Sequence, residues 1–174
     1  MTAILRQPLL LASCLVVGML ASCASTTKRE ALSPGRVTAS HHTSQPIQAV
    51  VSGGSKMSAL QLPGITNEDF QQALESSLVQ SGMFTSTGSG GYRLEAFIAN
   101  IDQPVFGFSM RVNMEVSYLL RRGGTTVWQK SIKSTYEASV GDAFAGPTRV
   151  RKATEGAARE NIAELIRQLN TRRP

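Results

Sequence analysis

The chain has 174 residues, of which 17% are charged and 41% hydrophobic, a composition that fits one globular domain and argues against disorder over most of its length. Its net charge of +6 favours anionic partners. The positive residues are spread along the chain and are not interleaved with aromatic residues, so we expect no nucleic-acid partner.

An export signal is predicted over residues 1–22. Arg6 is the only charge before an apolar stretch from Leu9 to Ser22, which ends in small residues. This stretch is shorter than the about 20 residues that a membrane-spanning helix needs. The pattern therefore indicates a cleaved signal peptide. A plain secretory signal that happens to end near a cysteine is the alternative interpretation.

A lipidation site is predicted at Cys23. Residues 20–23, Leu-Ala-Ser-Cys, resemble the bacterial lipobox, in which the cysteine thiol is acylated and the chain is cleaved before it. Residues 11–14 match equally well, but only about five apolar residues precede them, fewer than the about 7 to 15 of a signal's apolar region. Cys14 is then removed with the signal, so the mature chain has no cysteine pair for a disulfide.

The lipobox resemblance implies several acyl chains, palmitate among them, on Cys23, and two chains already give stable anchoring to a membrane. Ala24 follows the cysteine in place of an aspartate. By resemblance to the sorting rule of enteric bacteria, this favours periplasm-facing attachment at the outer membrane over the inner membrane.

A flexible, lipidated tether is predicted over residues 23–45. The segment is rich in Ser, Thr, His and Pro and has no apolar periodicity. A flexible chain of this length reaches roughly 25 Å, so we expect the domain to stay near the membrane without lying on it.

A single periplasmic domain is predicted over residues 46–174, beginning with a short strand from Gln48 to Ser52. A helix follows over residues 66–81. Thr66 can cap it, with Asp69 in the position of a capping-box acid and Gly82 suited to a left-handed C-terminal cap.

Three strands are predicted next, because apolar and polar residues alternate. Residues 92–98 form the first strand, and Pro104 follows it. From Phe106 to Leu120 every even position is apolar, which predicts a long strand with one apolar and one wet face. A turn at residues 121–124 leads into the third strand, over residues 125–138.

Helical periodicity returns over residues 148–170. The order strand, helix, three strands, helix predicts an α+β fold: a two-layer sandwich in which a mixed sheet of about four strands has two helices on one face. Gly156 inside the last helix indicates close packing on the sheet.

Four features carry a resemblance to small proteobacterial lipoproteins of poorly known function. They are Cys23 after Leu-Ala-Ser, the helix end at residues 81–84, the run of residues 92–96 and the last helix over residues 149–162. In element order, residues 46–170 also resemble YajG-type lipoproteins, the lipoprotein LptE and the auxiliary lipoproteins of lipid-transport ABC systems. The resemblance implies a periplasmic lipoprotein domain, and among functional residues it carries over Cys23 alone.

No catalytic residues, metal site or cofactor are predicted. His41 and His42 are the only histidines, and they lie in the predicted tether, which offers no scaffold for a site. Arg149, Arg151 and Lys152 begin the last helix, where positive charge opposes the helix dipole. We consider them a candidate anion-binding site, with ion pairing to Glu155 as the alternative.

The sequence therefore predicts a lipid-anchored envelope protein that binds or scaffolds an envelope protein, or an anionic lipid or glycan, without catalysis. The candidate surfaces are the wet face of the hairpin over residues 105–138, the basic cluster and an edge strand. The alternative is a small periplasmic hydrolase or transferase with a cleft around Asp102, Asp142 or Glu155.

Overall fold

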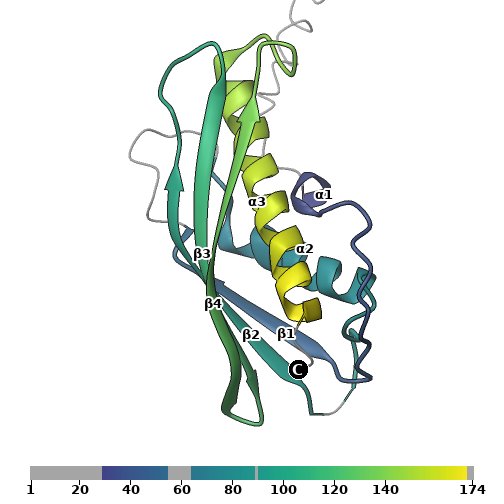
Figure 1. The fold of residues 1–174 in the computed structure, drawn as a ribbon. Helices are drawn as coiled ribbons and strands as arrows, with labels where there is room; N and C mark the ends of the chain where they lie inside the picture. Colours follow the sequence, from purple (N-terminus) through teal and green to yellow (C-terminus); the bar gives the residue numbers. More distant parts are fainter. Residues whose placement is uncertain (1–28, 55–63, 89, 172–174) are drawn as a thin grey trace, which may run out of the picture.

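The computed structural model describes residues 29–54, 64–88 and 90–171. The predicted signal peptide and Cys23 lie outside these ranges. The elements, shown in Figure 1, are α1 (Arg29–Leu32), β1 (Ile47–Ser52), α2 (Asn67–Gln80), β2 (Tyr92–Asp102), β3 (Met110–Arg122), β4 (Thr125–Ala138) and α3 (Gly146–Thr171).

The four strands form one mixed sheet in the order β1-β2-β3-β4. β1 runs parallel to β2, because α2 returns the chain to the same end of the sheet, and the other pairs are antiparallel. α2 and α3 pack on one face of this sheet (Figure 1). The predicted α+β fold is confirmed. No helix within the described ranges has the length and apolar character needed to cross a bilayer.

The local signals in the sequence explain the first helix of this layer. The Thr66 hydroxyl accepts a hydrogen bond from the Asp69 amide at 3.0 Å and so caps α2. Ile65 and Phe70, on either side of the cap, are both buried. Gly82 has a φ of +79°, the left-handed conformation that ends the helix.

The sheet is apolar on the face under the helices and polar on the other. Residues at even positions of β3, such as Val112, Val116 and Leu120, are fully buried. On the opposite face, cross-strand ion pairs link β3 to β4, among them Arg111 with Glu137 at 2.7 Å. The predicted wet face of the hairpin is therefore present.

Residues 29–45 correct the prediction of a flexible tether. This segment contains α1 and packs on α2 and α3, with Leu32 and Ala39 buried in the common core. Backbone hydrogen bonds join Ala39 to Ser81 and Thr43 to Met83, both at 2.9 Å. A few apolar residues and main-chain bonds thus hold the segment, so apolar periodicity could not reveal it.

The long central strand begins later than its alternating pattern predicted. β3 starts at Met110, and residues 105–108 lie in a loop. Pro104 and Gly107, which has a φ of +150°, stand in this connection between β2 and β3. Phe106 and Phe108, predicted on the apolar face of a strand, are instead 87% and 90% exposed.

A buried polar network joins α3 to the sheet. The Asn161 side chain, at 0% exposure, accepts from the Tyr118 hydroxyl at 2.8 Å and donates to the Ile132 carbonyl at 3.0 Å. Its amide also donates to the Ser134 hydroxyl at 3.0 Å. Every polar atom of the Asn161 side chain therefore has a partner, which makes its burial tolerable.

Candidate functional site

A shallow groove runs between the edge strand β4 and α3. Its volume is about 620 Å³, and it is lined by residues 130–136 of β4 together with Glu160, Glu164, Arg167 and Gln168 of α3. Positive and negative side chains both contribute to this β4–α3 groove. It therefore suits a polar segment that carries charges of both signs, and it is no enclosed pocket for a small molecule.

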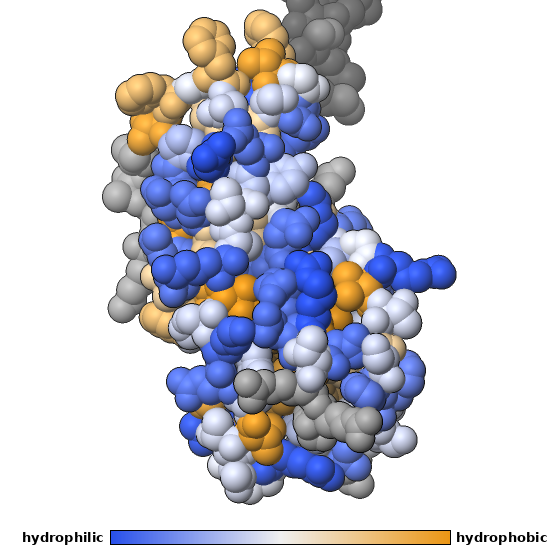
Figure 2. Space-filling model, in the orientation of Figure 1, coloured by the Kyte–Doolittle hydropathy of each residue, from blue (hydrophilic) through white to orange (hydrophobic). Residues whose placement is uncertain are grey.

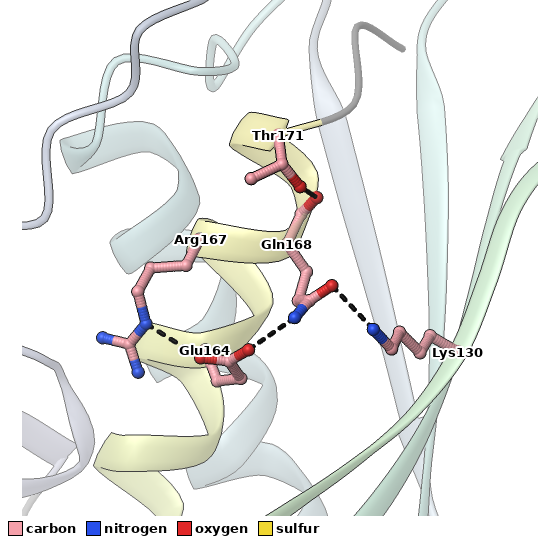
Figure 3. A network of polar contacts seen from close by, with 5 residues as sticks. All are labelled: Lys130, Glu164, Arg167, Gln168 and Thr171. Atoms are coloured by element: carbon pink, nitrogen blue, oxygen red, sulfur yellow. Dashed lines mark hydrogen bonds and ion pairs between the residues drawn. The ribbon is translucent and has the colours of Figure 1, made fainter.

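Hydrogen bonds fix the side chains at one end of the groove (Figure 3). The Lys130 ammonium of β4 donates to Gln168 Oε1 at 2.7 Å, and Gln168 Nε2 donates to Glu164 at 2.6 Å. Arg167 Nε donates to the other Glu164 oxygen at 2.8 Å. The four side chains are thus pre-organised across the two elements, which reduces the entropy lost when a partner binds.

Glu164 is held as an anion in this network. The hydrogen bond from Gln168, and next the hydrogen bond from Arg167, lower its pKa below the ordinary value of a glutamate. A carboxyl that is already ionised at neutral pH can accept hydrogen bonds or pair with a cation. It is poorly suited to donate a proton in catalysis.

Both edge strands of the sheet are engaged by a helix side chain. The Ala49 amide of β1 donates to Glu75 of α2 at 2.7 Å. At the other edge, Asn161 of α3 binds the Ile132 carbonyl of β4. Covering edge groups in this way discourages pairing with a further strand. Strand addition at an edge, considered from the sequence, stays a prediction.

The basic cluster predicted as an anion site has partners within the protein. Arg149 is 8% exposed. Its guanidinium donates hydrogen bonds to the Ala143 and Phe144 carbonyls and, at 3.2 Å, to the Gly107 carbonyl. Lys152 Nζ donates to the Asp142 carbonyl at 2.6 Å. These carbonyls offset the cost of positive charge at the start of α3 without requiring a ligand.

Arg151 pairs with Glu155 at 3.1 Å, the alternative that the sequence analysis considered. Glu155 is 6% exposed, so the pair is largely shielded from solvent. The structure thus places the three basic residues at one end of α3 and gives each a different partner. Anion binding by Arg149, Arg151 and Lys152 stays a prediction.

The sequence predicted turns around Asp102 and Asp142 at this end of the molecule but missed the exposed phenylalanines that the two loops carry. Phe144, in the loop between β4 and α3, is 93% exposed, and Phe106 and Phe108 lie in the loop between β2 and β3. Figure 2 shows hydrophobic residues gathered at the end where these loops lie. Pro104 and Gly107, residues typical of loops, were the signal in the sequence that could have located the first loop, although the alternation itself continues through Phe106 and Phe108.

The remaining predicted residues lie apart from the groove. His42 Nδ1 is 2.6 Å from the Gly82 carbonyl, so this histidine helps dock the segment before β1. Asp142 accepts hydrogen bonds from the Ser139 amide and hydroxyl. The hydrogen bond from the backbone amide is the main cause of the lowered pKa of Asp142. Within the described ranges, no group of three or more His, Cys, Asp or Glu side chains is placed to hold a metal ion.

No protein-family model and no curated protein sequence matches the chain. Solved structures do. The crystal structure of XCC0632 from Xanthomonas campestris, of the DUF330 family, matches with a TM-score of 0.60 and 14% identity over 80% of this chain and 94% of that one. The CT253 protein of Chlamydia trachomatis matches with a TM-score of 0.54 and 9% identity over 74% and 96%.

This chain shares its fold with these two proteins. A minor lipoprotein from Acinetobacter baumannii has a TM-score of 0.49 and 10% identity, with 75% and 93% of the two chains covered. At these identities the likeness concerns the fold alone.

Proposed function

We propose that this chain is a lipid-anchored protein of the cell envelope that acts without catalysis as a binding module for an envelope protein. The β4–α3 groove is its binding surface. The observation that carries the proposal is the set of charged and amide side chains held across β4 and α3 by hydrogen bonds.

Attachment through Cys23 is supported by the lipobox-like segment at residues 20–23, and packed residues follow a few positions later. Arg29 lies six positions after Cys23, and α1 begins there. Six residues span at most about 20 Å, so lipidation at Cys23 holds the folded body close to the bilayer. Ala24 favours the outer membrane as the site of attachment.

The chemistry of the carboxyl groups supports binding over catalysis. The pKa values of Glu137, Asp142 and Glu164 are all lowered by hydrogen bonds, so these groups stay ionised at neutral pH. An acid catalyst needs a raised pKa. The hydrolase or transferase considered from the sequence would need a cleft around Asp102, Asp142 or Glu155, yet Glu155 is paired with Arg151 inside the fold.

Site-specific photocrosslinking in intact cells tests the binding surface. A photoreactive residue at Glu160, an exposed position in the groove, is expected to capture one defined envelope protein. The same residue at Gln72, an exposed position on α2, is the control and is expected to capture none. The variants Lys130→Glu and Cys23→Ala should each abolish capture at position 160.

Equal capture from positions 160 and 72 would contradict the groove as a specific surface. Capture that survives Lys130→Glu would show that the fixed network does not contribute to binding. Loss in Cys23→Ala alone would support the anchor but not a contribution of the Lys130 network to binding.

A further inference from the structure

Three phenylalanines project from one end of the molecule. Phe106, Phe108 and Phe144 are 87%, 90% and 93% exposed, and Val105 and Val140 beside them are 63% and 45% exposed. Single exposed hydrophobic residues are ordinary, but a cluster of large ones marks an interaction surface. We define Val105, Phe106, Phe108, Val140 and Phe144 as the phenylalanine tip.

The tip is built rigidly from two loops that are distant in sequence. Arg149 donates to Gly107 O in the β2–β3 loop and to the Ala143 and Phe144 carbonyls in the β4–α3 loop, and so holds the loops together. Within the second loop, Asp142 binds the Ser139 amide at 2.7 Å. The phenylalanines are therefore presented on a fixed frame.

The composition of the loops suits entry into an apolar layer. Residues 103–109 carry no charge, and residues 139–147 carry one, on Asp142. The Asp142 carboxylate accepts hydrogen bonds from the Ser139 amide and hydroxyl, which replace part of its hydration. Few polar side chains would consequently lose hydration if the tip entered the interface of a bilayer.

The length of the chain between Cys23 and α1 favours a lipid bilayer as the occupant. Arg159 Nη1 donates to the Ala31 carbonyl at 3.2 Å, so α1 lies beside the middle of α3. From Gly146 to Arg159 the helix rises about 20 Å, at about 1.5 Å per residue. The six residues from Cys23 to Arg29 reach about the same distance, so the anchor and the tip can lie in one membrane plane.

We propose that the phenylalanine tip inserts into the interfacial layer of the membrane that holds the lipid anchor. The tip and the acyl chains then form two points of contact, which fix the orientation of the domain and place the far end of the β3–β4 hairpin away from the bilayer. Aromatic side chains suit this layer. Lys152, whose ammonium donates to the Asp142 carbonyl in the second loop, is an exposed cation of the kind that anionic lipid headgroups attract. This inference rests on the proposed attachment through Cys23.

Fluorescent labelling of single cysteines tests the insertion. The acylated Cys23 has no free thiol, so Phe108→Cys in the full, lipidated chain can be labelled alone with a polarity-sensitive dye. Val127→Cys is the control, because Val127 is 45% exposed near the turn at the opposite end of the hairpin. Each protein is reconstituted into phosphatidylcholine and phosphatidylglycerol vesicles with and without quencher-bearing acyl chains.

The dye at position 108 is expected to emit at shorter wavelength in vesicles and to lose fluorescence to the lipid quencher, whereas the dye at 127 does neither. Equal behaviour at the two positions would overturn the proposal. So would a signal at 108 that grows with protein density at fixed lipid, since it would assign the tip to a second copy of the chain. Vesicle flotation separates a missing anchor from an uninserted tip, because an unanchored chain does not float.

Discussion

Replacing Asn161 with alanine is expected to lower the free energy of unfolding by about 2 to 4 kcal/mol. The change removes the partner of the buried Tyr118 hydroxyl and of the Ile132 carbonyl. Each buried polar group left without a partner costs about 1 to 3 kcal/mol, and the lost side chain leaves a cavity between α3 and the sheet. Chemical denaturation of wild type and variant measures the difference.

Asn113→Ala is the matched control, because Asn113 is an exposed asparagine whose side chain bonds Thr135 on the solvated face. That substitution is expected to change the free energy of unfolding by no more than about 0.5 kcal/mol.

Burial raises the pKa of the Tyr118 phenol above its ordinary value. The contribution of this network should therefore be constant below about pH 10, where the unfolded phenol titrates, and should fall as the pH rises further. Equal losses in the two asparagine variants would contradict the assigned role of Asn161.

Replacing Gly156 with alanine is expected to destabilise the fold by about 1 to 3 kcal/mol, although alanine favours a helix by up to about 1 kcal/mol. A Cβ at this position would lie 2.3 Å from Cγ and Cδ1 of the Tyr136 ring. Cγ adjoins the backbone of β4, so the ring cannot move away from this contact freely, and the Arg159 guanidinium lies 5.4 Å from the ring centroid. Thermal unfolding of the variant gives the sign of the effect.

The double change Gly156→Ala with Tyr136→Ala is the control for this contact. With the ring removed, the added methyl group should no longer cost stability, so the double variant should be about as stable as Tyr136→Ala alone. A stabilising effect of Gly156→Ala in the wild-type background would show that α3 and β4 are not as closely packed as the structure places them.

Most of the sheet and both long helices could be predicted from the sequence because local and global signals agree there. Thr66, Phe70 and Gly82 mark α2 by capping, packing and backbone conformation together. The expectation of close packing at Gly156 is confirmed by its contact with Tyr136. Where such signals reinforce one another, a short sequence pattern is sufficient to place an element.

The segment before β1 could not be predicted, because its order comes from tertiary contacts. Leu32 and Ala39 pack into the core, and main-chain bonds to Ser81 and Met83 hold the rest. The polar composition of residues 29–45 therefore suggested a flexible tether, whereas the structure shows that this segment packs on α2 and α3. The correction has a functional consequence, since α1 begins at Arg29, six positions after Cys23 in the sequence.

The exposure of Phe106 and Phe108 could not be predicted, because the alternation of apolar and polar residues extends beyond the N-terminal end of β3. Phe106 and Phe108 keep the alternation of β3 but follow Pro104 and flank Gly107, where the chain leaves the sheet. The groove between β4 and α3 could not be anticipated either. Lys130 and Gln168 are far apart in sequence, and only the packing of α3 on β4 brings them together.

The most direct test of the account is the mass of the mature N-terminus. Trypsin releases residues 23–28 as one peptide, and we expect this peptide from membranes to carry acyl chains on Cys23 and to be absent when Cys23 is replaced by alanine. An unmodified Cys23 peptide, or a mature chain that begins at another residue, would contradict lipid anchoring and with it the placement of the domain against the bilayer.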